Sequence, residues 1–364
     1  MTWSARYRRL TGAASMPPRW AFGFIQSTER YHDQEELLAV ARRYVELGLP
    51  LEGIVLDWMS WPDGLWGQKS LDPARFPDAE DLCRRMHDMG TKLMVSIWPH
   101  VHGDGTDQLE LAAADAMLAN GTTYDAFDPK ARALYWKQAE TALFAKGVDA
   151  WWTDCSEPFE ANWNGAREPS PEERMRINTT EVERYLGPDR RNAYSLLHSR
   201  GIWEGQRATG SPKRVLNLTR SAYPGRQRYG TYSWSGDIVA TWESLRRQVA
   251  EGLSFAASGL PYWTTDVGAF FPGKVCPGLD GASFLRGDFD AGDKTWATAN
   301  CSCAGSSTPP SCRCCARTAP ARRARSGTST ATVLVLIAGQ FSGAVSASFV
   351  VADAGLVLAS SAPG

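Results

Sequence analysis

The stretch ARALYWKQAETALFAKGVDAWWTD, residues 131–154, decides the fold class of the chain. Its first part, Ala131 to Ala145, has the apolar spacing of a helix, and Val148 to Asp154 forms a short apolar strand that ends on a carboxylate. A helix that leads directly into an apolar strand is the repeating unit of an α/β protein with a parallel sheet. We therefore expect the same unit on both sides of this stretch.

The helix–strand unit recurs along the first 296 residues. The expected strands are 21–26, 53–57, 92–98, 148–154, 214–219, 230–234 and 260–265, and the expected helices are 33–47, 78–89, 131–145, 179–200 and 242–258. Seven such strands in succession favour a (β/α)8 TIM barrel over an open sheet, with the eighth strand due next. Chemistry in such barrels takes place at the carboxyl ends of the strands, so residues there are the candidates for a site.

The overall composition is that of an ordinary globular protein. Of 364 residues, 43% are hydrophobic and 22% are charged, and the chain is long enough for one barrel of about 250 residues. The net charge of −1 gives no indication of a nucleic-acid or anionic-membrane partner. No signal peptide opens the chain and no apolar run could span a membrane. We expect a soluble protein that is cytoplasmic by default, unless a full-length parent carries an export signal.

A change in composition at residue 297 divides the chain into two parts. All fifteen Trp and all eleven Tyr lie in residues 1–296, whereas residues 297–364 contain no Trp, Tyr, Lys, Glu or His. The tail holds five of the eight Cys, but their spacing is C-x-C and C-x-C-C, and structural zinc sites use pairs such as C-x-x-C. A zinc site, a disordered low-complexity tail and translation in the wrong frame are the three interpretations.

A frameshift accounts best for the composition of the tail. If the true frame starts at the third base of each tail codon, every Cys codon supplies the last two bases of a Leu, Val or Met codon. Residues 298–313 then permit Tyr-Arg-Glu-Leu-Phe-Val-Arg-Trp-Phe-Gln-Tyr-Ala-Ala-Phe-Leu-Pro, which begins as an amphipathic helix, and residues 316–319 permit Arg-Ala-His-Gly. We predict a barrel domain over 1–296 and an out-of-frame, disordered tail over 297–364, with the eighth strand lost.

Two carboxylates at strand ends are the candidate catalytic residues. Asp154 ends the fourth strand, and Asp237 follows the sixth strand after Trp234-Ser-Gly, where the Gly permits a tight turn. A strand-end Asp is often only a helix cap or a turn residue. Together, however, the two provide what glycoside hydrolysis requires, namely one carboxylate that attacks and one carboxylic acid that protonates the leaving oxygen, about 5 Å apart in retaining enzymes.

Other polar or aromatic residues near strand ends are candidate ligands for a sugar. They are Asp57, Trp98, Trp151, Arg220, Trp234 and Asp266. The carboxylates can accept bonds from hydroxyls or cap helices, the Arg can bind a carboxylate or a sugar, and each Trp can line a pocket or belong to the core. His100 and His102 could bind a metal, but no third ligand is evident. We therefore expect no metal site.

These motifs resemble those of glycoside hydrolase family 31, the α-glucosidase and α-xylosidase family. Three segments carry the resemblance: 151–157 for the nucleophile, 219–237 for the sugar-binding Arg and the acid/base, and 263–268 for the next barrel strand. The resemblance extends from residue 7 to about residue 273, and it implies a TIM-barrel catalytic domain. The segment 57–67 is more similar to the α-xylosidase branch than to a typical α-glucosidase.

The resemblance implies a mechanism and a substrate class. Asp154 would attack the anomeric carbon and form a β-glycosyl-enzyme, and Asp237 would protonate the departing oxygen and then activate water. The side chains that would shape the −1 subsite are Asp57, Trp98, Arg220 and Trp234. The substrate is expected to be a terminal α-xyloside or α-glucoside of an oligosaccharide, with no cofactor. A transglycosylase with the same site and a non-catalytic carbohydrate-binding barrel are the alternatives.

The chain departs from this family's pattern in two ways. Family members usually carry an N-terminal β-sandwich and later β-domains, neither of which is found here, and they place Arg-x-His-Gly at the eighth strand, where residues 316–319 read Ala-Arg-Thr-Ala. The frame-corrected reading restores that segment, which independently supports the frameshift. We therefore expect a truncated, inactive chain whose barrel is open, with two unpaired strand edges.

Overall fold

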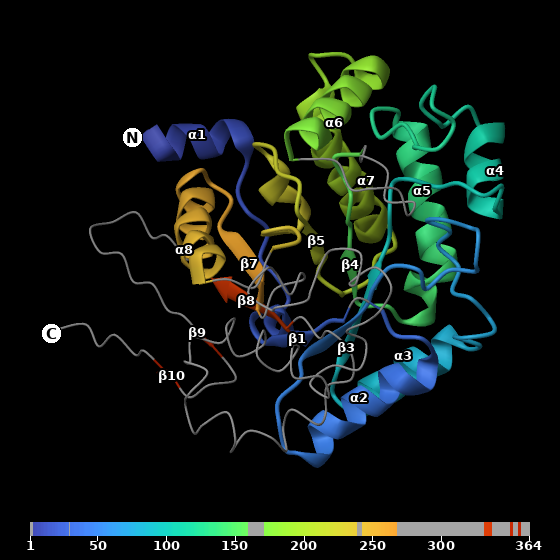
Figure 1. Ribbon diagram of the computed structural model, residues 1–364, viewed down its shortest axis with the longest axis vertical. Helices are drawn as coiled ribbons and strands as arrows, with labels where there is room; N and C mark the ends of the chain where they lie inside the picture. The colour runs from blue at the N-terminus through green and yellow to red at the C-terminus, as the bar shows by residue number, and fades with distance from the viewer. Residues whose placement is uncertain are drawn as a thin grey trace, which may run out of the picture. The chain divides into compact units, whose positions relative to one another are not determined.

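Alternating strands and helices make up the part of the chain that the computed structural model describes, namely residues 3–28, 30–158, 171–238, 242–267 and three short strands of the tail (Figure 1). The strands before the tail are β1 (Phe24–Gln26), β2 (Gly53–Leu56), β3 (Lys92–Ser96), β4 (Ala150–Trp152), β5 (Asn217–Thr219), β6 (Thr231–Trp234) and β7 (Tyr262–Val267). The α-helices are α1 (Trp3–Thr11), α2 (Gln34–Glu46), α3 (Ala79–Asp88), α4 (Thr106–Ala113), α5 (Pro129–Ala142), α6 (Pro171–Leu186), α7 (Tyr194–Ala208) and α8 (Trp242–Ala257). Short 3-10 turns are η1 (Arg19–Phe22), η2 (Phe144–Lys146), η3 (Arg191–Ala193) and η4 (Arg226–Tyr229).

The sheet has the strand order of a TIM barrel. Neighbouring strands follow the order of the chain from β1 to β7, and β1 pairs with β2, β4 with β5 and β6 with β7 in parallel. All four residues of β2 and of β6 are buried, which is typical of a parallel sheet covered on both faces. The expected α/β barrel class is therefore confirmed.

The strand after β7 differs from the eighth strand of a (β/α)8 barrel. Among the described strands, the next is β8 (Ala331–Leu336), which comes from the tail and pairs antiparallel with both β7 and β1. The parallel repeat thus stops at β7, and the barrel is incomplete in that sense. The expectation of two unpaired edges is wrong, because β8 pairs with both β7 and β1. Two further tail strands, β9 (Val350–Val351) and β10 (Leu356–Val357), pair with each other.

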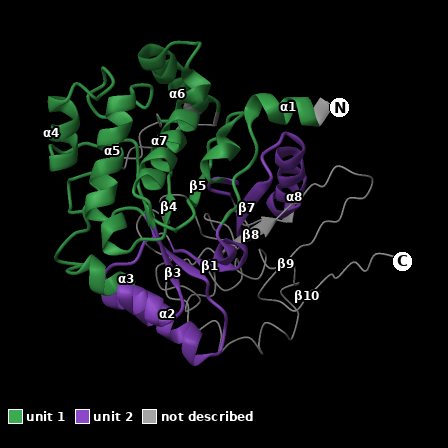
Figure 2. Cartoon of the chain, turned by 180° about the vertical axis from the view of Figure 1, so that it is seen from behind, with its two compact units in different colours: residues 1–17, 58–83, 95–231 green, residues 18–57, 84–94, 232–364 purple. Residues whose placement is uncertain are grey.

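The chain divides into two compact units, and each unit is built from separate segments of the sequence (Figure 2). Unit 1 comprises 1–17, 58–83 and 95–231, and unit 2 comprises 18–57, 84–94 and 232–364. Unit 1 contains β4, β5 and helices α4 to α7, whereas unit 2 contains β1, β2, β7, β8, α2 and α8. The predicted domain boundary at residue 297, the Cys cluster and residues 316–319 lie outside the described residues.

The helices differ from the sequence-based expectation at three places. The predicted helix 179–200 is two helices, α6 and α7, because Gly187 adopts a left-handed φ of 79° and Pro188 cannot continue a helix. Helices α1 and α4 were not expected, and α4 buries only one apolar side chain, Leu111, so its periodicity is weak. No described helix has both the length and the apolar character needed to cross a membrane.

Candidate active site

Asp154 lies two residues beyond the end of β4, with its side chain 16% exposed. Strand β4 is placed by its pairing with β5, and Thr153 continues the ladder by donating from its N–H to Leu218 O at 2.7 Å. Cys155 then adopts a left-handed φ of 52°, and its N–H donates to Asp154 Oδ1 at 2.7 Å. The tight turn therefore presents the carboxylate at the carboxyl end of β4.

Arg220 directly follows β5 and joins two carboxylates. Its Nε lies 2.9 Å from Glu157 Oε1 and 3.4 Å from Asp154 Oδ1, and its Nη2 donates to Cys155 Sγ at 3.2 Å. Because β4 and β5 are parallel neighbours, their carboxyl ends meet, which brings the Arg to both acids. Glu157 was not among the candidates chosen from the sequence, although it is the first carboxylate after Asp154.

The charges around Asp154 act in opposite directions on its ionisation. Burial raises the pKa of Asp154 above its usual range, and the negative charge of Glu157 raises it further. The positive charge of Arg220 and the N–H of Cys155 lower the pKa. Arg220 is therefore the charged group that favours the ionised carboxylate in this setting.

A cluster of four indole rings packs around Cys155, the neighbour of Asp154. It consists of Trp58, Trp61, Trp66 and Trp98, which we call the tryptophan cluster. Trp98 stacks on Trp58 with ring centroids 6.2 Å apart and meets Trp66 edge to face at 5.3 Å. Its Nε1 donates to Ser96 Oγ at 3.1 Å, and its carbonyl oxygen accepts from Tyr135 Oη at 2.9 Å. Trp98 thus belongs to an aromatic wall that adjoins the residue following Asp154.

Trp151 does not belong to this wall. It is fully buried, its Nε1 donates to Gln206 Oε1 at 2.9 Å, and its ring meets Trp136 of α5 edge to face at 5.7 Å. Side chains alternate along a strand, so Trp151 points to the opposite face from Trp152. Trp151 is a buried residue that joins β4 to α5 and α7, and its role in sugar binding stays a prediction.

The remaining candidates lie in unit 2, at or near the ends of β2, β6 and β7. Asp57 follows β2 and is 8% exposed, Trp234 ends β6 and is 2% exposed, and Asp266 lies within β7 at 5% exposed. Asp237 is exposed, three residues beyond β6. Gly236 before it has a left-handed φ of 72°, which provides the tight turn that the sequence predicts. Among these four, Asp237 is therefore the carboxylate most open to solvent.

His100 and His102, the two histidines considered as metal ligands, pack against each other and against Trp66. His100 and His102 lie edge to face with centroids 5.3 Å apart, and His102 stacks on Trp66 at 5.6 Å. Burial lowers the pKa of His100 to about 4, so its ring is neutral at pH 7. Within the described part of the chain, no group of three or more His, Cys, Asp or Glu side chains could hold a metal ion.

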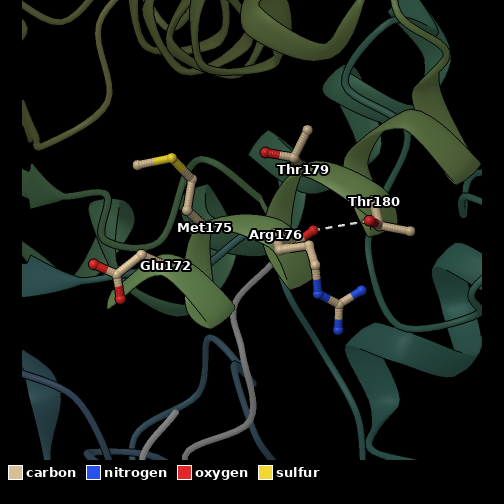
Figure 3. Close-up of a pocket in the computed structure, with 5 residues that line it drawn as sticks. All are labelled: Glu172, Met175, Arg176, Thr179 and Thr180. Atoms are coloured by element: carbon tan, nitrogen blue, oxygen red, sulfur yellow. Dashed lines mark hydrogen bonds between the residues drawn. The ribbon is translucent and has the colours of Figure 1, made fainter. Parts of the chain in front are cut away.

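A surface hollow on α6 lies apart from these residues (Figure 3). It is lined by Glu172, Met175, Arg176, Thr179 and Thr180. All five come from a single helix, Thr180 Oγ1 donates to Arg176 O at 2.8 Å, and Met175 is 71% exposed. It lacks a buried carboxylate, so it is not the candidate active site.

Known proteins resemble the chain over most of the described region. Residues 14–286 match the family described as "Glycosyl hydrolases family 31 TIM-barrel domain". An α-xylosidase of Saccharolobus solfataricus is 40% identical over 269 residues, which cover 74% of this chain and 35% of that protein. Alpha-xylosidase A of Aspergillus niger is 33% identical over 298 residues, which cover 74% of this chain and 40% of that protein.

Solved structures give the same result. The family 31 α-xylosidase from Xanthomonas citri has a TM-score of 0.67 and 37% identity, with 78% of this chain and 32% of that chain covered. A family 31 α-xylosidase from a soil metagenome, complexed with xylose, has a TM-score of 0.63 and 32% identity, with 73% and 39% covered. The fold and the family match define a TIM-barrel protein of the glycoside hydrolase class. The chain belongs to glycoside hydrolase family 31, and it spans between 32% and 40% of the length of these relatives.

Proposed function

We propose that this chain carries the barrel core of a retaining exo-α-glycosidase that releases terminal α-xylose or α-glucose from oligosaccharides. The observation that carries the proposal is the setting of Asp154. Its carboxylate is largely buried at the end of β4, is 3.4 Å from the guanidinium of Arg220, and adjoins the tryptophan cluster through Cys155. An anion beside apolar rings is suited to attack a sugar whose ring stacks on them.

In the proposed mechanism, Asp154 Oδ forms a bond to the anomeric carbon while the glycosidic C–O bond breaks. The leaving oxygen takes the proton of Asp237, the exposed carboxyl group three residues beyond β6. In the second step Asp237 takes a proton from water, the water oxygen bonds to the anomeric carbon, and Asp154 is released. Two displacements return the product to the α configuration.

An α-xyloside is the preferred substrate class in this proposal. The four similar proteins reported above are all named α-xylosidases, and one of the two solved structures holds xylose. An α-glucosidase of Saccharolobus solfataricus is also similar, at 28% identity over 298 residues. The proposal therefore includes glucosides, and the assay must compare the two sugars directly.

The test is hydrolysis of 4-nitrophenyl α-xyloside and α-glucoside by this chain and by a version with the frame restored after residue 296. We expect the restored version to cleave the xyloside faster than the glucoside. We expect this chain to cleave neither. Asp154→Asn should lower kcat by at least about 10³-fold and Asp237→Asn by about 10²-fold or more. Proton NMR should detect the α-anomer as the first product, and a β-anomer would overturn the retaining mechanism.

Asp149→Asn is the matched control for these variants. Asp149 is another buried carboxylate, at the opposite end of the same strand region, and it pairs with Lys213 at 3.0 Å. We expect this variant to lose stability but to keep the kcat of the folded enzyme. If Asp149→Asn and Asp154→Asn lower kcat equally, the catalytic assignment of Asp154 fails.

The two alternatives give different results in the same assay. A transglycosylase would release nitrophenol while transferring the sugar to an added acceptor such as xylose or glucose, so the transfer product would exceed free sugar. A non-catalytic barrel would bind methyl α-xyloside but release no nitrophenol in the restored version. Either result would replace hydrolysis as the proposed function.

A further inference from the structure

Unit 1 contains a buried ion pair, Lys69–Asp107, that is linked to the tryptophan cluster. The side chain of Lys69 is fully buried and that of Asp107 is 10% exposed, with Lys69 Nζ 3.4 Å from Asp107 Oδ2. The same oxygen accepts from the backbone N–H of Lys69 at 2.7 Å, and Gln138 Oε1 accepts from Lys69 Nζ at 3.1 Å. The ammonium group therefore contacts two neighbouring elements, α4 through Asp107 and α5 through Gln138.

Such a pair is a costly way to stabilise a fold. Burial lowers the pKa of Lys69, which means that the charged form is disfavoured, and the charges of Asp107 and Glu110 only oppose this effect. An apolar pair of the same volume often stabilises a protein as well or better. A buried Lys–Asp pair is thus better explained by the positions that it fixes.

Asp107 fixes the segment of chain that carries Trp66. Lys69 lies three residues beyond Trp66, and Gln68 Oε1 accepts from the N–H of Asp107 at 3.1 Å. The N–H of His102 donates to Trp66 O at 3.0 Å. Between them, Gly67 has a left-handed φ of 70°, and a Cβ there would lie 2.0 Å from His100 O. The Trp66 segment is therefore fixed against the segment after β3.

Lys69 is also linked to Trp98, through Tyr135. Lys69 Nζ lies 4.0 Å from the centre of the Tyr135 ring, a cation–π contact. Tyr135 Oη in turn donates to Trp98 O at 2.9 Å. Lys69 is thus connected to Trp66 through its own segment of chain and to Trp98 through Tyr135, and the two rings meet at 5.3 Å in the cluster that packs on Cys155.

We propose that Lys69 is a positioning residue, which sets the arrangement of Trp66 and Trp98 and thereby the aromatic wall beside Asp154. Lys69 has no direct part in the chemistry. The arrangement of the rings is a local property of unit 1, whereas the statement that the wall binds a pyranoside ring rests on the proposed function. The two statements are tested separately.

The first experiment measures how fast iodoacetamide alkylates two buried thiols in the folded 364-residue chain, by peptide mass spectrometry. Cys155 is 2% exposed within the tryptophan cluster, and Cys83 is 2% exposed on α3. In Lys69→Met we expect Cys155 to react at least about tenfold faster, because a loosened wall opens locally, while Cys83 changes less than about twofold.

Lys213→Met is the matched control. Lys213 pairs with Asp149, and both charges act on Cys83. The positive charge of Lys213 lowers the pKa of Cys83, so its loss raises that pKa and should slow the alkylation of Cys83, while the Cys155 rate should change less than about twofold. If Lys69→Met accelerates both thiols equally, or neither, the pair only stabilises the fold and the positioning role is overturned.

A second variant addresses the case in which Lys69→Met leaves Asp107 charged and the chain fails to fold. The double variant Lys69→Met/Asp107→Asn removes both charges, and the Asn oxygen can still accept from the N–H of residue 69. The same selective acceleration of Cys155 is expected. An unchanged Cys155 rate in the folded double variant would overturn the proposal.

The second experiment measures affinity for methyl α-D-xyloside by tryptophan fluorescence in this chain. We expect the Kd to rise at least about tenfold in Lys69→Met, since small misplacements of binding groups are costly. If the unaltered chain does not bind the sugar, the sugar-binding part of the proposed function fails while the thiol rates still judge Lys69. If the unaltered chain and the variant bind equally, the positioning role fails and the proposed function stands.

Discussion

His198 is a buried histidine whose titration should make the fold sensitive to acid. Its side chain is fully buried on α7, its Nδ1 lies 2.5 Å from Tyr124 Oη, and the Tyr135 ring meets it at 5.2 Å. Burial lowers the pKa of His198 to about 3, and the positive charge of Lys69 acts in the same direction. The folded protein therefore keeps this ring neutral throughout the mildly acidic range.

The loss of stability on acidification follows from the difference between the pKa of His198 in the folded state and in the unfolded state. An exposed histidine in the unfolded chain has a pKa of about 6.5. Between pH 6.5 and 3, only the unfolded state binds the proton, so the free energy of unfolding falls as the pH falls. Each pH unit inside that window contributes about 1.4 kcal/mol, which amounts to a loss of about 2 kcal/mol between pH 7 and pH 5.

The measurement is urea unfolding at pH 7 and pH 5 for the unaltered chain and for His198→Gln. The difference between the two proteins isolates His198, since other groups such as His100 are common to both. We expect the unaltered chain to lose about 2 kcal/mol more than the variant on acidification. Tyr124→Phe is the control, because it removes the hydrogen-bond partner but keeps the histidine buried. Equal acid losses in the unaltered chain and His198→Gln would refute the reasoning.

Three further outcomes are expected. Gly67→Ala should destabilise the folded chain by roughly 2 kcal/mol or more in urea unfolding, because its φ is left-handed and the Cβ meets His100 O; a change within error would contradict this. Arg220→Met should raise the pKa of Asp154 further, so the acid limb of the rate–pH profile of the frame-restored enzyme should move to higher pH. A move to lower pH would show that Arg220 does not favour the ionised carboxylate. Sequencing the gene around codon 297 should give Tyr-Arg-Glu-Leu-Phe in the shifted frame, and any other reading rejects the frameshift.

The repeat of strands and helices could be predicted from sequence because parallel strands are continuous apolar runs. Strand β2 was predicted as 53–57 and found as Gly53–Leu56, and α2 was predicted as 33–47 and found as Gln34–Glu46. Asp154 was predicted at a strand end because it interrupts such a run, and it lies there. These features depend on the order of apolar and polar residues within a short segment, and a single sequence is enough to show that order.

Contacts between distant residues could not be predicted in the same way. Trp151 and Trp152 are identical in type and both buried, and only the direction of the strand decides that Trp151 is the one that contacts α5 and α7. The contact of Glu157 with Arg220 depends on the register of β4 against β5 across more than sixty residues of chain. Lys69 lies in an irregular segment without a periodic pattern, so only its buried partners identify it.

Asp154 and Asp266 differ in whether their contacts come from before or after residue 297, where the composition of the chain changes. Arg220, which pairs with Asp154, and the tryptophan cluster, which packs on Cys155, both come from residues 58–220. By contrast, β7 pairs along its whole length with β8, and Asp266 lies opposite Thr332 in the tail. If the tail is out of frame as predicted, restoring the frame would alter the strand beside Asp266 and leave the described partners of Asp154 in place. Restoring the frame should change sugar binding at the β7 side, whereas the ionisation of Asp154 should stay as it is in this chain.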